Sequence, residues 1–184
     1  HTLTTMPTGG FSTKNASVAH YNSAYIDYVI VIFMVLAGIN FSLHYQMLRG
    51  KTLIFWRDSE CRFFLLLCLG FTVVITFDIY GSLYDTLGKA FQYASFQVVS
   101  LVTTTGYATA DYEKWPGLSQ ILLFLCMFIG ASAGSTGGGM KCARIMVAFK
   151  YCYRELFTLI HPSSVSQVKM NGAVIPNHVL RSIM

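Results

Sequence analysis

Apolar residues fall along this chain in long blocks, which polar stretches separate. The first block covers residues 24–48, and the second covers residues 63–84. Each is long enough to cross a hydrocarbon core of roughly 30 Å, because a helix rises about 1.5 Å per residue. The pattern therefore predicts two membrane-spanning helices that run in opposite directions.

The stretch 86–102 has a mixed pattern, in which polar side chains such as Lys89, Gln92 and Gln97 interrupt the apolar residues. A helix of this composition is poorly suited to face lipid, but it can be buried among other helices. We therefore predict a short buried helix here. It leads into a loop rich in threonine and glycine at residues 103–109.

A third apolar block, residues 118–133, is short, and a glycine-rich stretch follows it at once. This stretch consists of Gly134, Ser135, Thr136, Gly137, Gly138 and Gly139. Helical patterning resumes at residues 140–160, which predicts one membrane helix that is broken in its middle. The break is either a gate loop or a static kink that permits close helix packing. It is not a phosphate-binding loop, because Met140 separates the last glycine from Lys141 and Cys142 follows.

Charged residues are few and unevenly placed. They make up 11% of the chain, against about a quarter in a typical soluble domain. The net charge is +5, and the basic residues gather in segments 49–62 and 141–169, which the positive-inside rule places in the cytoplasm. This topology explains the basic balance without a nucleic-acid partner. The five cysteines include no CxxC pair and predict neither a metal site nor a disulfide framework.

Two segments resemble each other, TTMPTGGFST at residues 4–13 and TTTGYAT at residues 103–109. Aligning Gly9 with Gly106 gives an offset of 97 residues (106 − 9). The interval holds an outgoing helix, a cytoplasmic loop, a returning helix and the short buried helix. The predicted repeat unit is therefore helix, pore helix, filter loop and helix.

The two loops have the composition of a cation filter. A cation that enters the membrane loses water, and the backbone carbonyls of a non-helical loop can replace that water. Glycine permits the positive φ values that turn successive carbonyls inward. The candidate filter residues are Thr8, Gly9, Gly10, Thr105, Gly106 and Tyr107. Ordinary extracellular turns are the alternative, which the buried helix before the second loop and the spanning run after each loop disfavour.

Three motifs occur together: TMPTGGFST, SLVTTTGYATADYEKWPG and MFIGASAGSTGGGMK. They resemble the Trk-type potassium uptake proteins, the TrkH/TrkG membrane subunits, which are related to the Ktr and plant HKT transporters. The resemblance implies an all-α membrane protein built from four potassium-channel-like repeats, with a broken, gate-bearing helix. It assigns residues 1–48 to the end of the second repeat, 49–62 to a cytoplasmic loop, 63–160 to the third repeat, and 161–184 to a cytoplasmic connection and the start of the fourth. We therefore expect a fragment of a longer protein, without the first and fourth repeats.

The same resemblance implies roles for particular residues and partners. Gly9 and Gly106 would be the filter glycines associated with potassium preference, and the loop at 134–141 would be a gate beneath the filter. Ala108 departs from the TVGYG signature of channels, which implies a looser filter. Family members are usually homodimers in the bacterial inner membrane, with the filter facing outside. Their cytoplasmic partner is a nucleotide-binding, TrkA-like regulatory subunit, and no cofactor is expected beyond the transported potassium.

Polar residues inside the apolar blocks each have two interpretations. Asp78 either raises the cation concentration in an outer vestibule or pairs with Lys89 to fix the pore helix, and we favour the pairing. Lys141 either holds the glycine-rich loop shut or extends to the membrane interface. Interfacial positions or interhelical hydrogen bonds are expected of Asp27, Asn40 and His44.

Potassium transport through a gated pore is the predicted function. A carrier-type secondary transporter with a substrate site at the membrane midplane is the alternative. It requires an inverted counterpart to the broken helix, and none is visible in the sequence. A membrane enzyme or scaffold is a third hypothesis, although the histidines are scattered and have no nearby nucleophile and acid.

Overall fold

Helices dominate the computed structural model, which describes residues 1–50, 53–161, 169–170 and 173–175. The predicted all-α class is confirmed, with one small addition. Strands β1 (Lys169–Met170) and β2 (Ala173–Val174) pair antiparallel. Met170 of β1 and Ile175, which follows β2, pack against Val147 of the last long helix. The predicted opening of a further helix at residues 178–184 lies outside the described residues.

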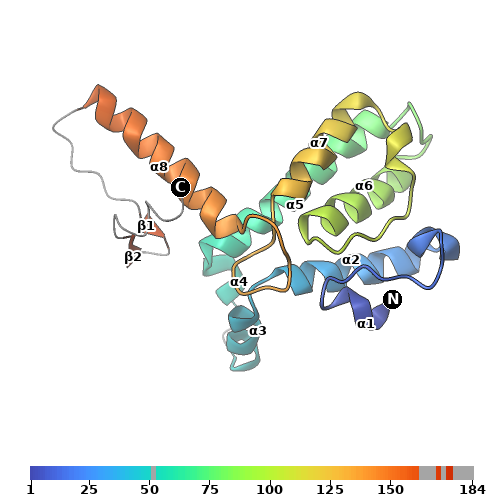
Figure 1. The fold of residues 1–184 in the computed structure, drawn as a ribbon, viewed down its shortest axis with the longest axis horizontal. Coiled ribbons are helices and arrows are strands. Elements are labelled where there is room, and N and C mark those ends of the chain that lie inside the picture. The colour runs from blue at the N-terminus through green and yellow to red at the C-terminus, as the bar shows by residue number, and fades with distance from the viewer. Residues whose placement is uncertain (51–52, 162–168, 171–172, 176–184) are drawn as a thin grey trace.

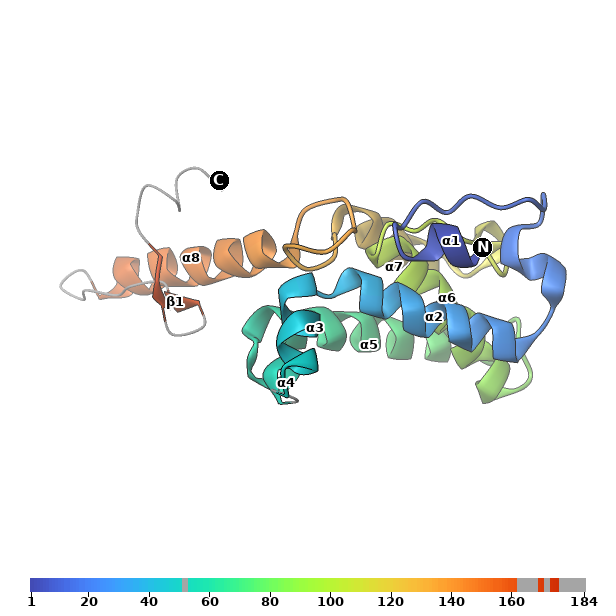
Figure 2. The same cartoon turned by 90° about the horizontal axis from the view of Figure 1, so that it is seen from below.

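The body of the molecule is a set of packed helices from which one helix projects (Figure 1). Helices α5 (Ser59–Ile79), α6 (Leu87–Val102) and α7 (Gly117–Phe128) pack on one another, and α2 (Ala24–Gly38) packs against α6. Helix α8 (Cys142–Ile160) extends away from this body in both views (Figure 2). The short helical segments are α1 (Thr2–Thr5), η1 (Ser17–Tyr21), α4 (Ile54–Arg57) and η2 (Tyr112–Lys114).

Helix α6 is the buried helix that the mixed pattern predicts. Small and β-branched residues recur every four positions on one of its sides and belong to the core shared with α5: Ala90, Ala94, Val98 and Val102. Another side carries Phe96 and Val99, which pack against Ile30 and Met34 of α2. The polar side chains are also accommodated, since the Gln92 amide donates to the Asp27 carboxylate of α2 at 2.8 Å. Of the two alternatives for Asp27, the structure shows the interhelical hydrogen bond.

Helix α5 begins at Ser59, four residues earlier than the second apolar block. The Asp58 carboxylate accepts a hydrogen bond from the Cys61 backbone N–H at 2.7 Å, which caps the helix there. Among the described residues, α5 is the helix long and apolar enough to cross a membrane alone. Large apolar side chains stand exposed along it, as on a surface that faces lipid: Leu66, Leu69, Val74 and Phe77.

The prediction of a single helix over residues 24–48 is wrong. Helix α2 ends at Gly38 and α3 (Phe41–Leu48) begins after Asn40, with a bend of 98° between them. The Asn40 side chain accepts from the Ser42 N–H at 2.8 Å and starts the new helix. The His44 ring contacts the Leu36 carbonyl at 2.9 Å, so one of the last carbonyls of α2 also gains a partner.

Candidate ion-conduction site

The first loop leaves α1 through a compact set of hydrogen bonds. The Thr8 N–H donates to the Thr5 carbonyl at 3.1 Å, and the Gly9 N–H donates to the Thr4 carbonyl at 2.9 Å. The Thr4 hydroxyl then donates to the Phe11 carbonyl at 3.0 Å. The end of α1 thus fixes the loop at three points.

The second loop leaves α6 through the same set of bonds. The Thr104 N–H donates to the Leu101 carbonyl at 3.0 Å, and the Thr105 N–H donates to the Ser100 carbonyl at 2.9 Å. The Ser100 hydroxyl donates to the Tyr107 carbonyl at 2.7 Å. Each bond lies 96 residues after its counterpart, so α1 corresponds to the last turn of α6.

This correspondence changes the register of the repeat. It matches Gly10 with Gly106 at an offset of 96 residues (106 − 10), whereas the sequence alignment matched Gly9 with Gly106 at 97. The backbone dihedrals agree with the new register, since φ is +64° at Gly10 and +82° at Gly106. Two residues earlier, φ is +53° at Thr8 and +57° at Thr104. Both loops therefore alternate between left-handed and ordinary conformations.

Loop carbonyls in both segments lack a hydrogen-bond donor within the described part of the chain. They belong to Thr8, Gly9 and Gly10 in the first loop, and to Thr103, Thr104, Thr105 and Gly106 in the second. Carbonyl oxygens without a protein donor, on backbone that alternates in hand, can coordinate a dehydrated cation.

The two loops lie against each other. A Cβ placed on Gly10 would stand 1.9 Å from the Thr105 carbonyl oxygen, so only glycine permits this approach. The Tyr107 side chain is 2% exposed, and its hydroxyl donates to the His1 carbonyl at 2.9 Å. Because its own carbonyl accepts from Ser100, Tyr107 supports the second loop rather than offering it a free oxygen.

The broken helix has a wider break than the glycines alone suggest. Helix α7 ends at Phe128 and α8 starts at Cys142. Backbone bonds close the base of the intervening loop: the Met140 N–H donates to the Phe128 carbonyl, the Gly130 N–H to the Met140 carbonyl, and the Cys142 N–H to the Ala131 carbonyl. The glycine-rich stretch is thus the tip of a closed loop.

This tip reaches both candidate filter loops. The Thr136 hydroxyl donates to the Met6 carbonyl at 2.9 Å, and the Thr8 hydroxyl donates to the Thr136 carbonyl at 3.1 Å. The Gly138 N–H donates to the Thr104 hydroxyl at 2.6 Å. A Cβ added to Gly137 would meet the Thr103 carbonyl oxygen at 3.1 Å. The structure therefore brings together the predicted gate residues and the predicted filter residues, which are far apart in sequence.

Further bonds hold the tip against the bend between α2 and α3. The Ser132 N–H donates to the Gly38 carbonyl at 3.0 Å, and the Phe41 N–H donates to the Gly134 carbonyl at 3.1 Å. The Lys141 ammonium group donates to the Gly137 carbonyl, so it points into the loop and not toward the end of α8.

Asp78 does not pair with Lys89 in the described part of the chain, in contrast to the interpretation favoured from the sequence. Its carboxylate accepts from the Ser119 hydroxyl at 2.5 Å and from the Ser119 N–H at 3.1 Å. Ser119 lies in the first turn of α7, where unpaired backbone N–H groups and the helix dipole favour an anion. Asp78 therefore ties α5 to the helix that follows the second loop.

Glu60 is a residue that the sequence analysis did not single out. It lies at the edge of the basic segment 49–62, where charged residues are ordinary, and the structure shows it 5% exposed. Its carboxylate accepts from the Ala133 N–H at 2.6 Å and the Ala143 N–H at 3.0 Å. Nothing in its own segment signals these contacts, because both partners lie more than seventy residues away.

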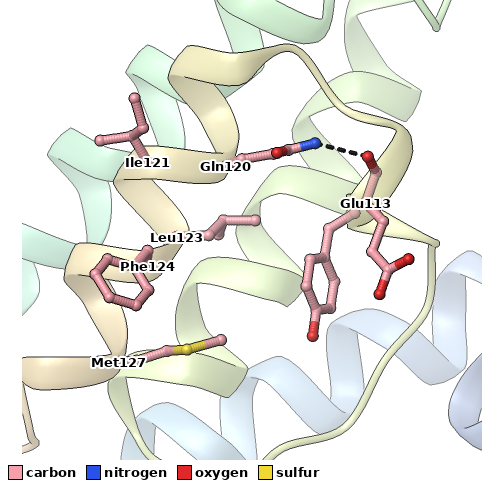
Figure 3. A pocket seen from close by; sticks show the side chains of 7 residues that line it. Glu113, Gln120, Ile121, Leu123, Phe124 and Met127 are labelled. Atoms are coloured by element: carbon pink, nitrogen blue, oxygen red, sulfur yellow. Dashed lines mark hydrogen bonds between the residues drawn. The ribbon is translucent and has the colours of Figure 1, made fainter.

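A groove of about 400 Å³ runs beside α7 (Figure 3). Its lining residues are Tyr112, Glu113, Gln120, Ile121, Leu123, Phe124 and Met127. Figure 3 shows Gln120, Leu123 and Met127 directed from α7 toward the loop that carries Glu113. The Gln120 amide donates to the Glu113 carbonyl at 2.6 Å and closes one end of the groove. The apolar side chains leave room for a partner of similar character.

Comparison with known proteins identifies close relatives of this chain. The family model that matches, over residues 1–184, is that of TrkH, described as a cation transport protein. The Trk system potassium uptake protein TrkH of Salmonella typhimurium is 40% identical over 189 residues, which cover 100% of this chain and 38% of that protein. The Trk system potassium uptake protein TrkG of Escherichia coli K12 is 36% identical and is covered to the same extent.

A solved structure has the same fold. The crystal structure of the potassium transporter TrkH from Vibrio parahaemolyticus matches with a TM-score of 0.93 at 34% sequence identity. The match covers 100% of this chain and 40% of that one. The chain thus spans about 38% of the length of the curated relatives it matches.

Proposed function

The chain belongs to the TrkH family of cation transport proteins, and we propose that it supplies two of the four filter strands of a potassium-conducting pore. The observation that carries this proposal is the matched pair of loops. They share three hydrogen bonds, two positive-φ positions and a run of carbonyls without protein donors. Relatives named as Trk system potassium uptake proteins support potassium as the ion.

Backbone strain at the loops supports a functional rather than a connecting role. Threonine is β-branched, and a positive φ is uncommon and unfavourable for it. Thr8 and Thr104 nevertheless both adopt it. Such strain persists where the surrounding structure enforces it, and it concentrates at functional sites. Here it turns neighbouring carbonyls toward one side, where a potassium ion would meet them.

We propose that the tip of the 129–141 loop is the gate of this pore. It contacts the inner ends of both filter loops through Thr136 and Gly138. Lys141 places a positive charge on the loop through its bond to the Gly137 carbonyl, which would disfavour a potassium ion beneath the filter. Conduction therefore requires the tip to move, and a static kink would not allow it.

The groove beside α7 is evidence that the full protein contains a further repeat. Counted from the first residue of each helix, Gln120 takes the place of Asp27, and Phe124 takes that of Val31. In α2 this face packs against the pore helix α6, with Asp27 bonded to Gln92. We therefore propose that the pore helix of the next repeat occupies the groove of α7. It would belong to the part of the relatives' length that this chain does not cover.

The repeats are direct, since the two loops run in the same chain direction at a constant offset. This argues against a carrier built on inverted repeats. We propose that the full protein lies in a bacterial inner membrane as a homodimer, with the filter side outside. The projecting α8 carries the basic residues Arg144, Lys150 and Arg154 toward the cytoplasm. A nucleotide-binding regulatory subunit there is positioned to act on the gate through this helix.

The filter assignment is tested by Gly106→Ser in the full-length protein. A side chain at φ +82° costs about 1–2 kcal/mol, so we expect the preference for potassium over sodium to fall about tenfold. Gly88→Ser is the matched control, because a Cβ there meets nothing within 4 Å. Ion flux into proteoliposomes gives both values, and an unchanged preference in Gly106→Ser would rule out the filter assignment.

A further inference from the structure

Glu60 joins the two sides of the broken helix through a single oxygen atom. Its Oε1 accepts from the Ala133 N–H, just before the glycine-rich tip, and from the Ala143 N–H, just after it. The carboxylate is 5% exposed and comes from the first turn of α5, a helix that takes no part in the break. One side chain of a neighbouring helix therefore fixes both ends of the loop.

The bond to Ala143 satisfies a need that α8 does not meet by itself. The first N–H groups of a helix have no partner within the helix. Lys141 occupies the N-cap position of α8, and its side chain makes no capping hydrogen bond. The Glu60 carboxylate serves as the cap from outside, and a negative charge at this end also suits the helix dipole. Hydrogen bonds to a charged acceptor are among the strong ones.

The bond to Ala133 acts on the tip. Three residues after Ala133, Thr136 bonds to Met6 beneath the first filter loop, and Gly138 bonds to Thr104 beneath the second. The loop is therefore held by the filter loops, by the bend between α2 and α3, and by Glu60. Because Ala133 and Ala143 share one acceptor atom, a movement of α8 that breaks one bond also disturbs the other.

We propose that Glu60 is a positioning residue of the gate, a latch that holds the loop tip beneath the filter until α8 moves. This proposal rests on the gate function proposed above. The latch ties the position of α8 to that of the tip. It also makes the position of the tip beneath the filter depend on a buried carboxylate outside the loop. Releasing the latch removes one of the bonds that hold the tip but leaves the filter loops intact, since their hydrogen bonds do not involve Glu60.

Two variants of the full-length protein test the latch, Glu60→Ala and Glu60→Gln. The first readout is the rate at which a maleimide labels Ser135→Cys, in a background whose exposed cysteines, Cys152 included, are replaced by serine. The second is potassium flux and the potassium-to-sodium ratio in proteoliposomes without the regulatory subunit. Glu155→Ala is the matched control, because it removes an exposed carboxylate that pairs with its neighbour Arg154 at 2.7 Å and lies outside the loop.

We expect Glu60→Ala to raise the labelling rate about tenfold, since two partly buried backbone donors lose their acceptor. Potassium flux should rise with it, and the potassium-to-sodium ratio should stay that of the wild type. Glu60→Gln keeps an oxygen acceptor but loses the charge, so its labelling rate should be intermediate. The control should match the wild type in every readout.

Wild-type labelling and flux in Glu60→Ala would overturn the latch, and so would a changed ion ratio, which would mean that the filter deforms. If Glu60→Ala does not reach the membrane, Glu60→Gln decides: faster labelling supports the latch, and wild-type labelling overturns it. Labelling needs no ion transport. A wild-type protein without potassium flux would therefore refute the proposed function, while labelling would still decide the latch.

Discussion

The two repeats agree at their candidate filter loops and differ in the helices that follow. The first loop leaves α1 and the second leaves α6 through the same three bonds, at an offset of 96 residues. After the first loop, the outgoing chain breaks at Ile39 and Asn40 and continues at once as α3. After the second, residues 129–141 separate α7 from α8.

The two breaks are stabilised in different ways. At the first, a side chain of the break itself caps the next helix, since Asn40 bonds to the Ser42 N–H, and His44 contacts the Leu36 carbonyl. At the second, backbone bonds close the base of the loop, but no side chain of the break caps α8, and Glu60 of α5 supplies that bond instead. The proposed gate therefore lies at the break whose helix cap comes from a residue far away in the sequence. A filter needs equivalent strands from each repeat, but a gate needs only one movable element.

The largest expected effect is a loss of ion selectivity, from a substitution at the contact between the two loops. Gly10→Ala places a methyl group 1.9 Å from the Thr105 carbonyl oxygen at a φ of +64°, so the two loops must separate. We expect a loss of more than about tenfold in potassium preference, measured by competitive flux of potassium and sodium. Gly9→Ala is the matched variant, because its Cβ meets the Phe11 ring at 3.3 Å and the Thr4 carbonyl oxygen at 3.8 Å, without a clash. Equal losses of potassium preference in the two variants would instead favour the alignment of Gly9 with Gly106, at an offset of 97 residues.

A smaller effect is expected at the second break. Removing residues 134–139 deletes the tip and its bonds to Met6 and Thr104, while the backbone bonds at the base of the loop remain possible. Potassium flux should rise several-fold and lose its control by the regulatory subunit. The potassium-to-sodium ratio is the internal control and should not change. Wild-type flux and regulation in this deletion would contradict the gate.

The smallest effect is expected at the first break. Asn40→Ala removes the cap of α3, which should lower the free energy of unfolding by about 1 kcal/mol without altering flux. Thermal unfolding of the full-length protein in detergent measures the change. Asn40→Asp keeps a capping oxygen and should retain most of the stability. A gain in flux from Asn40→Ala would mean that the first break moves as well.

Hydropathy and composition predict much of this fold. The helices α5 and α6, the two loops and the existence of a break after Phe128 all follow from short-range patterns. The bend at Gly38 is missed because Asn40 is one polar residue in a long apolar run. Its capping role depends on the backbone turning there, which hydropathy does not report. Gly38 and Asn40, which lie two residues apart in this run, are the available sequence signal of the bend.

The details of the site are harder to predict, because they depend on contacts between distant residues. A shift of one residue in the repeat alignment still matches glycine with glycine, so the sequence favours Gly9 as readily as Gly10. Pairing the aromatic residues Phe11 and Tyr107 gives the register seen in the structure. The partners of Asp78 and Glu60 carry no signal of their own, because Ser119, Ala133 and Ala143 are common residues in ordinary contexts.

The closed base of the 129–141 loop has a consequence for how such proteins can vary. Backbone bonds join Phe128 to Met140 and Ala131 to Cys142 without using any side chain of the tip. The tip at residues 134–139 is therefore an exchangeable cassette. Its length and composition can change, by engineering or by descent, and the surrounding helices keep their places.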